Sequence, residues 1–322
     1  MSSAASTVAV IGGSRFVGRA IVEALLQHGH RLITINRGLS PVEYPGQVER
    51  VVADRTDSAS FESVLRQVRS DWVVDVTAYC EEHTRTAVNA LQGRIRGFIH
   101  ISTLSVYRWP FPCPVTESWP LETDPANEYG FHKAECERVL HAASGFPWTS
   151  LRLPAVFGPH DPVSREGYLL GNLLRGRPIM VPVKPFLCQN ICVQDVAAAV
   201  HRLIENTGKH RERAYNIGGH PFTLEEYVNR MGRIIGREPC LIQSKSETLR
   251  AANADPGRLP YFFEGDLMMD TSPIKDAAGF VPKFTLDRGL STTIDWLVAN
   301  PRQSTYWGLP WERSMSGMAQ CT

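Results

Sequence analysis

The chain has 322 residues, of which 43% are hydrophobic, and a formal net charge of +1 at pH 7. It is long enough for one large α/β domain, alone or with a smaller lobe, while the near-zero charge argues against a nucleic-acid surface. No apolar run approaches membrane-spanning length and the start lacks the pattern of a leader, so we expect a soluble cytoplasmic protein with no membrane partner. The seven cysteines form no C-x-x-C pair, so we expect no metal site, and from the net charge we expect no nucleic-acid partner.

The first predicted element is a strand over residues 8–11 that runs into a glycine-rich turn. The turn reads Gly12-Gly13-Ser14-Arg15-Phe16-Val17-Gly18, and a helical pattern follows over residues 20–27. Glycines allow a sharp turn close to a pyrophosphate, and the helix N-terminus offers N–H groups to that anion. We therefore expect residues 12–18 to bind a dinucleotide, although the usual middle glycine of G-x-x-G-x-x-G is Arg15. The alternative is a purely structural turn.

The second predicted strand, residues 31–35, ends at Asn36, Arg37 and Gly38. In dinucleotide-binding folds the end of this strand meets the adenosine ribose, where a carboxylate favours NAD(H) and an arginine favours the 2′-phosphate of NADP(H). Here the strand end has no acid, and Arg15 could reach the same phosphate. The pattern predicts NADP(H) in preference to NAD(H). Two solvated surface arginines are the alternative.

The following strands also end in polar or small residues. A strand over residues 51–53 ends at Asp54 and Arg55, where an adenine would lie, and Asp54 could accept a hydrogen bond from its amino group. Helical patterns over 61–68 and 82–93 alternate with strands. The strand over residues 72–76 ends at Thr77-Ala78-Tyr79, whose small residues would let a cofactor ribose approach. The strand over residues 98–101 ends at the hydroxyl-rich segment Ser102–Tyr107.

This alternation of strands and helices predicts an α/β fold, a Rossmann-type doubly wound parallel sheet. Ligands bind beyond the carboxyl ends of such strands, and every polar strand end named above lies on that edge.

The sequence Glu128-Tyr129-Gly130-Phe131-His132-Lys133 carries the predicted chemistry. Tyr129 and Lys133 are four residues apart, so they share one helix face. An ammonium beside a tyrosine lowers the phenol pKa from about 10, and the pair can then exchange a proton with an alcohol or ketone. A hydroxyl of Thr103 or Ser102 would hold the substrate oxygen. We also place Ser102, Tyr129 and Lys133 beside the cofactor, where the lysine can hold the nicotinamide ribose. A surface helix pair is the alternative.

Taken together, these features resemble the extended or atypical short-chain dehydrogenase/reductase superfamily, and within it the NAD-dependent epimerase/dehydratase group. The resemblance covers nearly the whole chain. Residues 12–18 are similar to the G-G-x-x-F-x-G turn of that group, and residues 191–197 to its I-H-V-x-D segment. The resemblance implies that Thr103, Tyr129 and Lys133 are catalytic.

The resemblance also implies contacts on the nicotinamide side of the cofactor. Residues 151–159 are similar to the strand and loop that make them, and we assign Leu153, Pro154 and Val156 to this role. The family often pairs the helix that carries the tyrosine with the preceding helix in a dimer, so a homodimer is possible.

Three departures from nucleotide-sugar enzymes bear on the substrate. Ala155 stands where those enzymes usually have Asn, no arginine lies near Cys188, and residues 263–266 lack the arginine of an R-x-G-D motif. A diphosphate needs cationic, forked donors, so these losses favour a small polar or sugar-like substrate. A narrower likeness, carried by Arg15 and residues 36–38 and 158–162, is to a bacterial subgroup related to plastid RNA-associated epimerase-like proteins.

We place the dinucleotide-binding core in residues 1–160, with 188–218 returning to it, and a C-terminal α/β substrate lobe in 161–187 and 219–322. In the second half of the chain, His160 is either an additional acid/base or a solvated loop residue. The role of the tail from Pro301 onward, with Trp307 and Trp311, stays open. We expect a short strand over 214–217 and helices over 166–175, 195–206, 224–235, 271–278 and 286–298.

The leading hypothesis is an NAD(P)-dependent oxidoreductase that interconverts a secondary alcohol and a ketone on a small-molecule substrate. The second hypothesis is an epimerase or dehydratase, acting on a nucleotide sugar and using the cofactor transiently. A third is a non-catalytic cofactor-sensing or RNA-associated binding protein, against which Thr103, Tyr129 and Lys133 argue.

Overall fold

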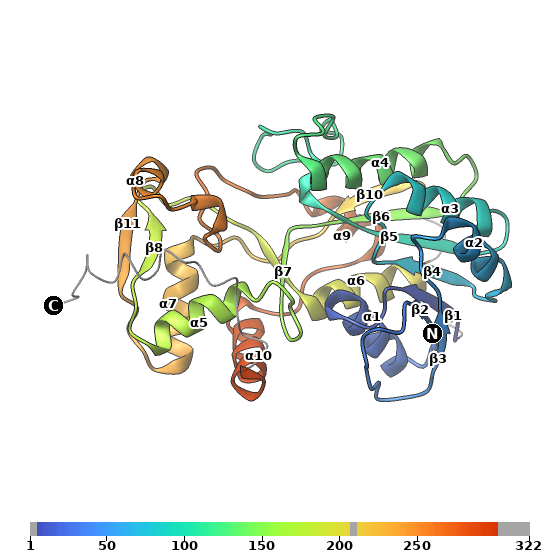
Figure 1. Cartoon of the computed structure of the whole chain (residues 1–322), viewed down its shortest axis with the longest axis horizontal. Coiled ribbons are helices and arrows are strands. Elements are labelled where there is room, and N and C mark those ends of the chain that lie inside the picture. The colour runs from blue at the N-terminus through green and yellow to red at the C-terminus, as the bar shows by residue number, and fades with distance from the viewer. Residues whose placement is uncertain (1–4, 207–210, 302–322) are drawn as a thin grey trace. The chain divides into compact units, whose positions relative to one another are not determined.

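The computed structural model describes residues 5–206 and 211–301, which form two compact units (Figure 1). The first unit holds the described residues up to 154 together with those of 193–218 and 269–282, and the second holds 155–192, 219–268 and those from 283 onward. The unit boundary thus lies at 154 rather than 160, the return begins at 193 rather than 188, and 269–282 join the first unit. Trp307 and Trp311 lie outside the described residues.

The first unit is built on a seven-stranded parallel sheet with the strand order β10-β6-β5-β4-β1-β2-β3. Its strands are β1 (Thr7–Ile11), β2 (Arg31–Asn36), β3 (Val48–Val52), β4 (Trp72–Asp75), β5 (Gly97–Thr103), β6 (Trp148–Leu153) and β10 (Arg213–Asn216). The order reverses between β1 and β4, so the crevice outside their carboxyl ends is the expected ligand position. The predicted doubly wound sheet is confirmed.

Helices cover both faces of this sheet (Figure 1). On one face α1 (Phe16–Gln27) packs against α6 (Val193–Glu205); on the other α2 (Ser58–Gln67), α3 (Glu81–Leu91) and α4 (Glu128–Ala142) lie side by side. The short helix η1 (Leu104–Val106) follows β5, and α9 (Ser272–Ala278) lies against β10. Because both faces are covered, the central strands are almost continuously apolar.

Alternate residues of β1 supply the core beneath α2 and α3. Ala9 and Ile11 are buried in one cluster with Phe61 and Leu65, which are four apart and therefore share one face of α2. The helix begins at an N-cap, Asp57, whose carboxylate accepts the N–H of Ser60. Among the described residues no helix has the length and apolar character that a membrane span requires.

The second unit has two small parallel sheets and several helices. Strands β7 (Ala155–Phe157) and β9 (Asn190–Cys192) pair, as do β8 (Ile179–Pro182) and β11 (Leu241–Ser244). The helical segments are α5 (Arg165–Leu174), α7 (Leu224–Ile235), α8 (Ser246–Ala251), η2 (Pro256–Arg258) and α10 (Leu286–Ala299). The sequence analysis missed α8 and these four strands, which are too short for a periodic pattern.

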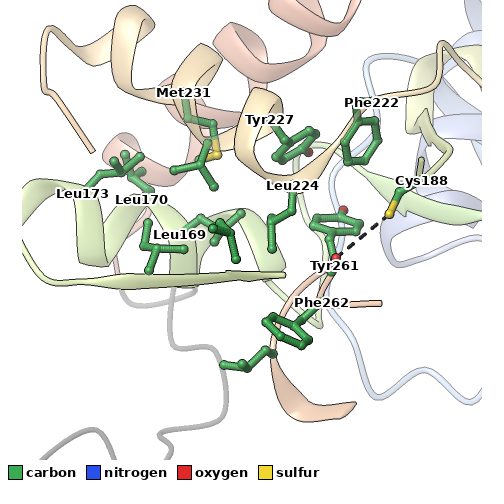
Figure 2. Packing of buried hydrophobic residues seen from close by; sticks show 14 of the residues in the cluster. Leu169, Leu170, Leu173, Cys188, Phe222, Leu224, Tyr227, Met231, Tyr261 and Phe262 are labelled. Carbon is green, nitrogen blue, oxygen red and sulfur yellow. Dashed lines mark hydrogen bonds between the residues drawn. The ribbon is translucent and has the colours of Figure 1, made fainter. Parts of the chain in front are cut away.

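Apolar faces of α5 and α7 form the core of this unit (Figure 2). Leu169, Leu170 and Leu173 follow helical spacing on α5, and Tyr227 and Met231 are four apart on α7, so each helix presents one apolar face. The predicted start of α7 is confirmed, because the Thr223 hydroxyl accepts the N–H of Glu226 at 3.2 Å.

Candidate active site

The turn after β1 requires its glycines. Gly12 has a φ of 87°, and a Cβ on Gly18 would lie 2.1 Å from the carbonyl oxygen of Gly12. A Cβ on Gly13 would lie 2.8 Å from Cγ2 of Thr34 on β2. The turn therefore holds the start of α1 tightly against the ends of β1 and β2. Tyr44, which the sequence analysis missed, adds a hydrogen bond from its hydroxyl to the Gly13 carbonyl at 3.0 Å.

The N-terminus of α1 fits a bound anion. Arg15 occupies the N-cap position with extended backbone and makes no side-chain capping bond, and the first turn contains no acidic residue. The first N–H groups of a helix lack intrahelical partners and lie at the positive end of its dipole. Together with the close glycine backbone, this end of α1 suits a pyrophosphate.

The ends of β2 and β3 combine a cation with a carboxylate. Arg37 is exposed, and the side chain of Asn36 accepts the N–H of Gly38 at 2.9 Å. Asp54 accepts hydrogen bonds from the backbone N–H and hydroxyl of Thr56, which hold its pKa below the ordinary value; Arg37 lowers it further to a smaller extent. The Asp54 carboxylate is therefore ionised close to the Arg37 guanidinium.

Arg55 pairs with the end of β4, and its contact with an adenine stays a prediction. Its guanidinium donates to both carboxylate oxygens of Asp75 at 2.7 and 3.0 Å and to the Thr77 hydroxyl at 2.9 Å. Asp75 is fully buried at the end of β4, and a Cβ on Gly12 would meet Thr77. The Arg55–Asp75 pair thus fixes the end of β4 beside the glycine turn. Sequence analysis passed over Asp75, although an acid that ends a buried apolar strand was a usable signal.

Helix α4 carries Tyr129 and Lys133 at different depths. Tyr129 is 51% exposed, whereas Lys133 is 2% exposed. The Lys133 ammonium donates to the carbonyls of Ala78 at 2.9 Å and Ile101 at 2.7 Å, and it lies 3.3 Å from Nε2 of His100. The structure therefore ties the predicted lysine to the carboxyl ends of β4 and β5, where the predicted Thr77–Tyr79 and Ser102–Thr103 segments lie.

The start of α4 sits directly on the loop after β5. A Cβ on Gly130 would lie 2.3 Å from the carbonyl oxygen of Ser105, so only glycine permits this approach. Asn127 caps the helix by accepting the N–H of Gly130. Gly130, another residue that the sequence analysis did not assign, therefore holds its neighbour Tyr129 next to the segment that begins with Thr103.

The two hydroxyl candidates at the end of β5 have different surroundings. Thr103 is partly exposed, and its hydroxyl oxygen accepts the N–H of Ser105 at 3.2 Å. Ser102 is buried, and its hydroxyl donates to Glu137 at 2.6 Å. Thr103 is therefore the hydroxyl available at the surface, while Ser102 belongs to an interior network.

That interior network anchors α4 to the sheet. Glu137 is fully buried and accepts from Nε of Arg152 at 3.1 Å and from the Ser150 hydroxyl at 3.0 Å. Arg152, on β6, also donates to the Tyr107 hydroxyl at 2.9 Å. Because Glu137 lies one helical turn after Lys133, this ion pair fixes the depth of the lysine.

The charge of Lys133 depends on its surroundings. Burial lowers the pKa of its ammonium below the ordinary value, and the nearby carboxylates of Asp75 and Glu137 oppose that effect. Lys133 lies one helical turn after the exposed Tyr129 on the same face of α4, and a cation near a phenol favours the phenolate. The arrangement can therefore accept a proton from, or return one to, an alcohol oxygen at the surface.

The remaining predicted residues divide between the two units. Leu153 and Pro154 are buried at the end of β6 in the first unit, whereas Val156 lies on β7 of the second. Tyr79 is exposed, and its N–H donates to the His83 ring. His160 is partly buried, and the centroid of its ring lies 4.7 Å from that of the Trp296 ring; its two alternative roles stay predictions.

The profile of the NAD dependent epimerase/dehydratase family matches residues 8–218. The chain is 26% identical over 311 residues to a chloroplast stem-loop binding protein of 41 kDa from Arabidopsis thaliana, covering 90% of this chain and 79% of that protein. It is 25% identical over 242 residues to 2′-dehydrokanamycin reductase from Streptomyces kanamyceticus, covering 71% and 67%.

Among solved structures, the fold is similar to that of UDP-glucose 4-epimerase from Thermotoga maritima, crystallised with UDP-glucose. The TM-score is 0.74 at 20% identity, and the match covers 92% of this chain and 99% of that chain. At this identity the likeness shows the fold, and the chemistry has to be argued from the residues described above.

Proposed function

Because the chain belongs to the NAD dependent epimerase/dehydratase family, we propose that Thr103, Tyr129 and Lys133 catalyse hydride transfer between a nicotinamide cofactor and a secondary alcohol or ketone. The observation that carries the proposal is the α4 geometry: an exposed tyrosine one turn from a buried lysine whose ammonium is tied to the ends of β4 and β5. The substrate that we propose is small and polar or sugar-like.

In the proposed mechanism each residue has one task. The chemistry that the cofactor supplies when bound is hydride transfer. Tyr129 takes the hydroxyl proton from an alcohol or gives one to a ketone oxygen. Lys133 keeps a positive charge beneath the phenol, which favours the phenolate. Thr103 donates a hydrogen bond to the reacting oxygen, and the α1 N-terminus and glycine turn hold the pyrophosphate.

A Tyr129→Phe variant tests this proposal. It removes the phenol hydroxyl, the proposed proton carrier, from an exposed position, so cofactor affinity should stay within about twofold while turnover falls by about 10²–10⁴. The assay follows NADPH absorbance with a panel of ketones and, in reverse, NADP⁺ with alcohols. Full turnover by the phenylalanine variant would refute the assignment of Tyr129.

For the cofactor, we propose NADP(H) rather than NAD(H). The exposed Arg37 at the end of β2, with no acid at that strand end, supports it. An Arg37→Ala variant should bind NADPH about tenfold more weakly, a loss of about 1.4 kcal/mol, with NADH binding unchanged.

Fluorescence titration measures both affinities. Arg31→Ala is the matched control, since Arg31 is exposed at the opposite end of the same strand. The difference in NADPH affinity between the unaltered chain and Arg37→Ala should shrink at high salt, because the Arg37 guanidinium that would bind the phosphate is exposed to solvent. Equal losses for the two cofactors, or tighter binding of NADH by the unaltered chain, would refute the phosphate-site proposal.

An epimerase or dehydratase is the second candidate, favoured by the solved relative whose substrate is a UDP-sugar. Those reactions return the hydride within one turnover, so the cofactor would copurify and resist exchange. The proposed reductase must exchange cofactor in each turnover, and the curated reductase relative favours it. Incubating the purified chain with labelled NADP⁺ and measuring the exchanged fraction distinguishes the two.

The stem-loop binding relative raises the third hypothesis of an RNA-associated protein. The net charge of +1 does not favour it. Retention of a stem-loop RNA on a filter by the Tyr129→Phe variant, with no turnover by the unaltered chain, would support it. The homodimer and the cytoplasmic location stay predictions.

A further inference from the structure

His100, which the mechanism above does not use, lies against Lys133. It is fully buried on β5, and its Nε2 is 3.3 Å from the lysine Nζ. Among the described residues, the ammonium donates to the carbonyls of Ala78 and Ile101 as well, and it lies 5.9 Å from the centroid of the Tyr79 ring. An ammonium has three N–H donors and no acceptor, so these three acceptors satisfy it completely.

The contact determines which nitrogen of His100 carries the proton. Because the ammonium can only donate, Nε2 must accept, and the neutral ring then has its proton on Nδ1. Burial, reinforced by the charges of Lys133 and Arg55, lowers the pKa of His100 well below 6.5, so the ring stays neutral. Nδ1 has no hydrogen-bond partner among the described residues.

The charged groups around Lys133 do not replace this acceptor. The anions near it are each paired with an arginine: Asp75 with Arg55, and Glu137 with Arg152. Burial raises the pKa of the Cys136 thiol, on α4, to about 11, so the thiol is neutral. The hydrogen bonds that the ammonium makes among the described residues therefore go to neutral acceptors, one of which is His100.

We propose that His100 is a positioning residue that provides the third acceptor of the Lys133 ammonium and so keeps it protonated and fixed beneath Tyr129. The meaning of this contact for turnover rests on the proposed function. The effect of His100 on Lys133 does not, so the two can be tested separately.

The test measures the pKa of Lys133 directly in the full chain. The chain has six lysines, so the ¹³C signal of each ε-methylene can be followed against pH and that of Lys133 assigned with Lys133→Arg. His100→Leu removes the acceptor, and we expect the pKa of Lys133 to fall by about one unit. His100→Gln retains an acceptor oxygen and should restore most of the value. His30→Leu is the control, since His30 is a buried histidine of the same unit that accepts the N–H of Ser6.

An unchanged pKa of Lys133 in a folded His100→Leu chain would overturn the proposal. If that variant does not fold, ¹⁵N spectra of the unaltered chain decide. A proton on Nδ1 and no titration of His100 between pH 5 and 8 support the proposal, and a proton on Nε2 or a titrating ring overturns it.

Turnover separates this inference from the proposed function. With an active substrate, His100→Leu should shift the alkaline limb of the kcat profile downward by the same amount as the pKa of Lys133, with little change in KM, and His100→Gln should reverse the shift. A shifted lysine pKa with an unshifted profile keeps the His100 assignment and refutes the proposed role of the Tyr129–Lys133 pair.

Discussion

Replacing Glu137 should destabilise the first unit more than any exposed change on α4. Its carboxylate is 0% exposed and faces the Arg152 guanidinium, whose side chain is 2% exposed. In a Glu137→Ala variant the guanidinium stays in the interior with neutral partners, the Tyr107 hydroxyl and the Glu117 carbonyl. The hydroxyls of Ser102 and Ser150 also lose their acceptor.

The magnitude follows from the burial of both charges. Removing one partner of a buried ion pair costs about 3–5 kcal/mol because the other charge is left uncompensated. Native domains are stable by about 5–15 kcal/mol, so the variant should lose about a fifth or more of its free energy of unfolding. A double variant with methionine at both positions should lose much less than the sum of the single changes, since no charge then stays buried.

Urea unfolding followed by circular dichroism measures each free energy at pH 7.5. The Glu135–Arg138 pair is the matched control, because it lies on the same helix but is partly exposed. Glu135→Ala should change the free energy of unfolding by at most about 1 kcal/mol. A Glu137→Ala loss no larger than the control loss, or additive single changes in the double variant, would refute the reasoning.

The pH dependence gives an independent check. Although burial opposes it, Arg152 together with the serine hydroxyls lowers the folded-state pKa of Glu137 below 4.5. A lowered carboxyl pKa contributes stability that is present above the unfolded-state value and is lost as the pH falls through the folded-state value. The difference in the free energy of unfolding between the unaltered chain and Glu137→Gln should therefore be largest near pH 7 and should decrease below about pH 4.5.

Two further changes test other parts of the first unit. Gly18→Ala places a Cβ 2.1 Å from the Gly12 carbonyl, so we expect at least about tenfold weaker NADPH binding by fluorescence. Gly46→Ala is the control, because its Cβ would make only an ordinary contact with Leu26 at 3.6 Å, and it should leave binding unchanged. Burial and the stacked ring of His28 lower the pKa of His201 to about 4. The unfolded chain therefore binds a proton more readily than the folded chain, and the free energy of unfolding falls by about 2 kcal/mol, after allowance for solvent screening, as the pH falls from 6.5 toward 4. His201→Gln should make the urea midpoint of unfolding less dependent on pH over that range. The same pH dependence in the variant and in the unaltered chain would contradict this prediction.

The sequence predicted those parts of the fold that depend on local pattern. The glycine turn, the apolar strands and the four-residue spacing of Tyr129 and Lys133 can each be recognised in a short stretch of sequence. Contacts that depend on the spatial order of the strands were not readable. Arg55 follows β3, whereas Asp75 is the last residue of β4, and β2 and β1 separate these strands in the sheet. Nothing local in the sequence therefore indicated that the two side chains pair.

The same limit explains the buried residues of α4. Glu137 reads in sequence as one more charge on a polar helix, because nothing local indicates that Arg152 on β6 faces it. In the second unit, strands of three or four residues such as β7 and β8 give no period to detect. Their positions are fixed by pairing with segments far along the chain.

The depth of each residue along one face of α4 connects stability with the proposed chemistry. Tyr129, Lys133 and Glu137 follow at intervals of four, and their exposed fractions fall from 51% to 2% to 0%. Glu137 fixes the helix to β6, Lys133 then meets the ends of β4 and β5, and only the phenol of Tyr129 reaches solvent. A change at Glu137 should therefore weaken both folding and proton transfer, whereas a change at Tyr129 should affect proton transfer alone. Equal stability of Tyr129→Phe and the unaltered chain, with turnover lost only in the former, is the result that this order of depth requires.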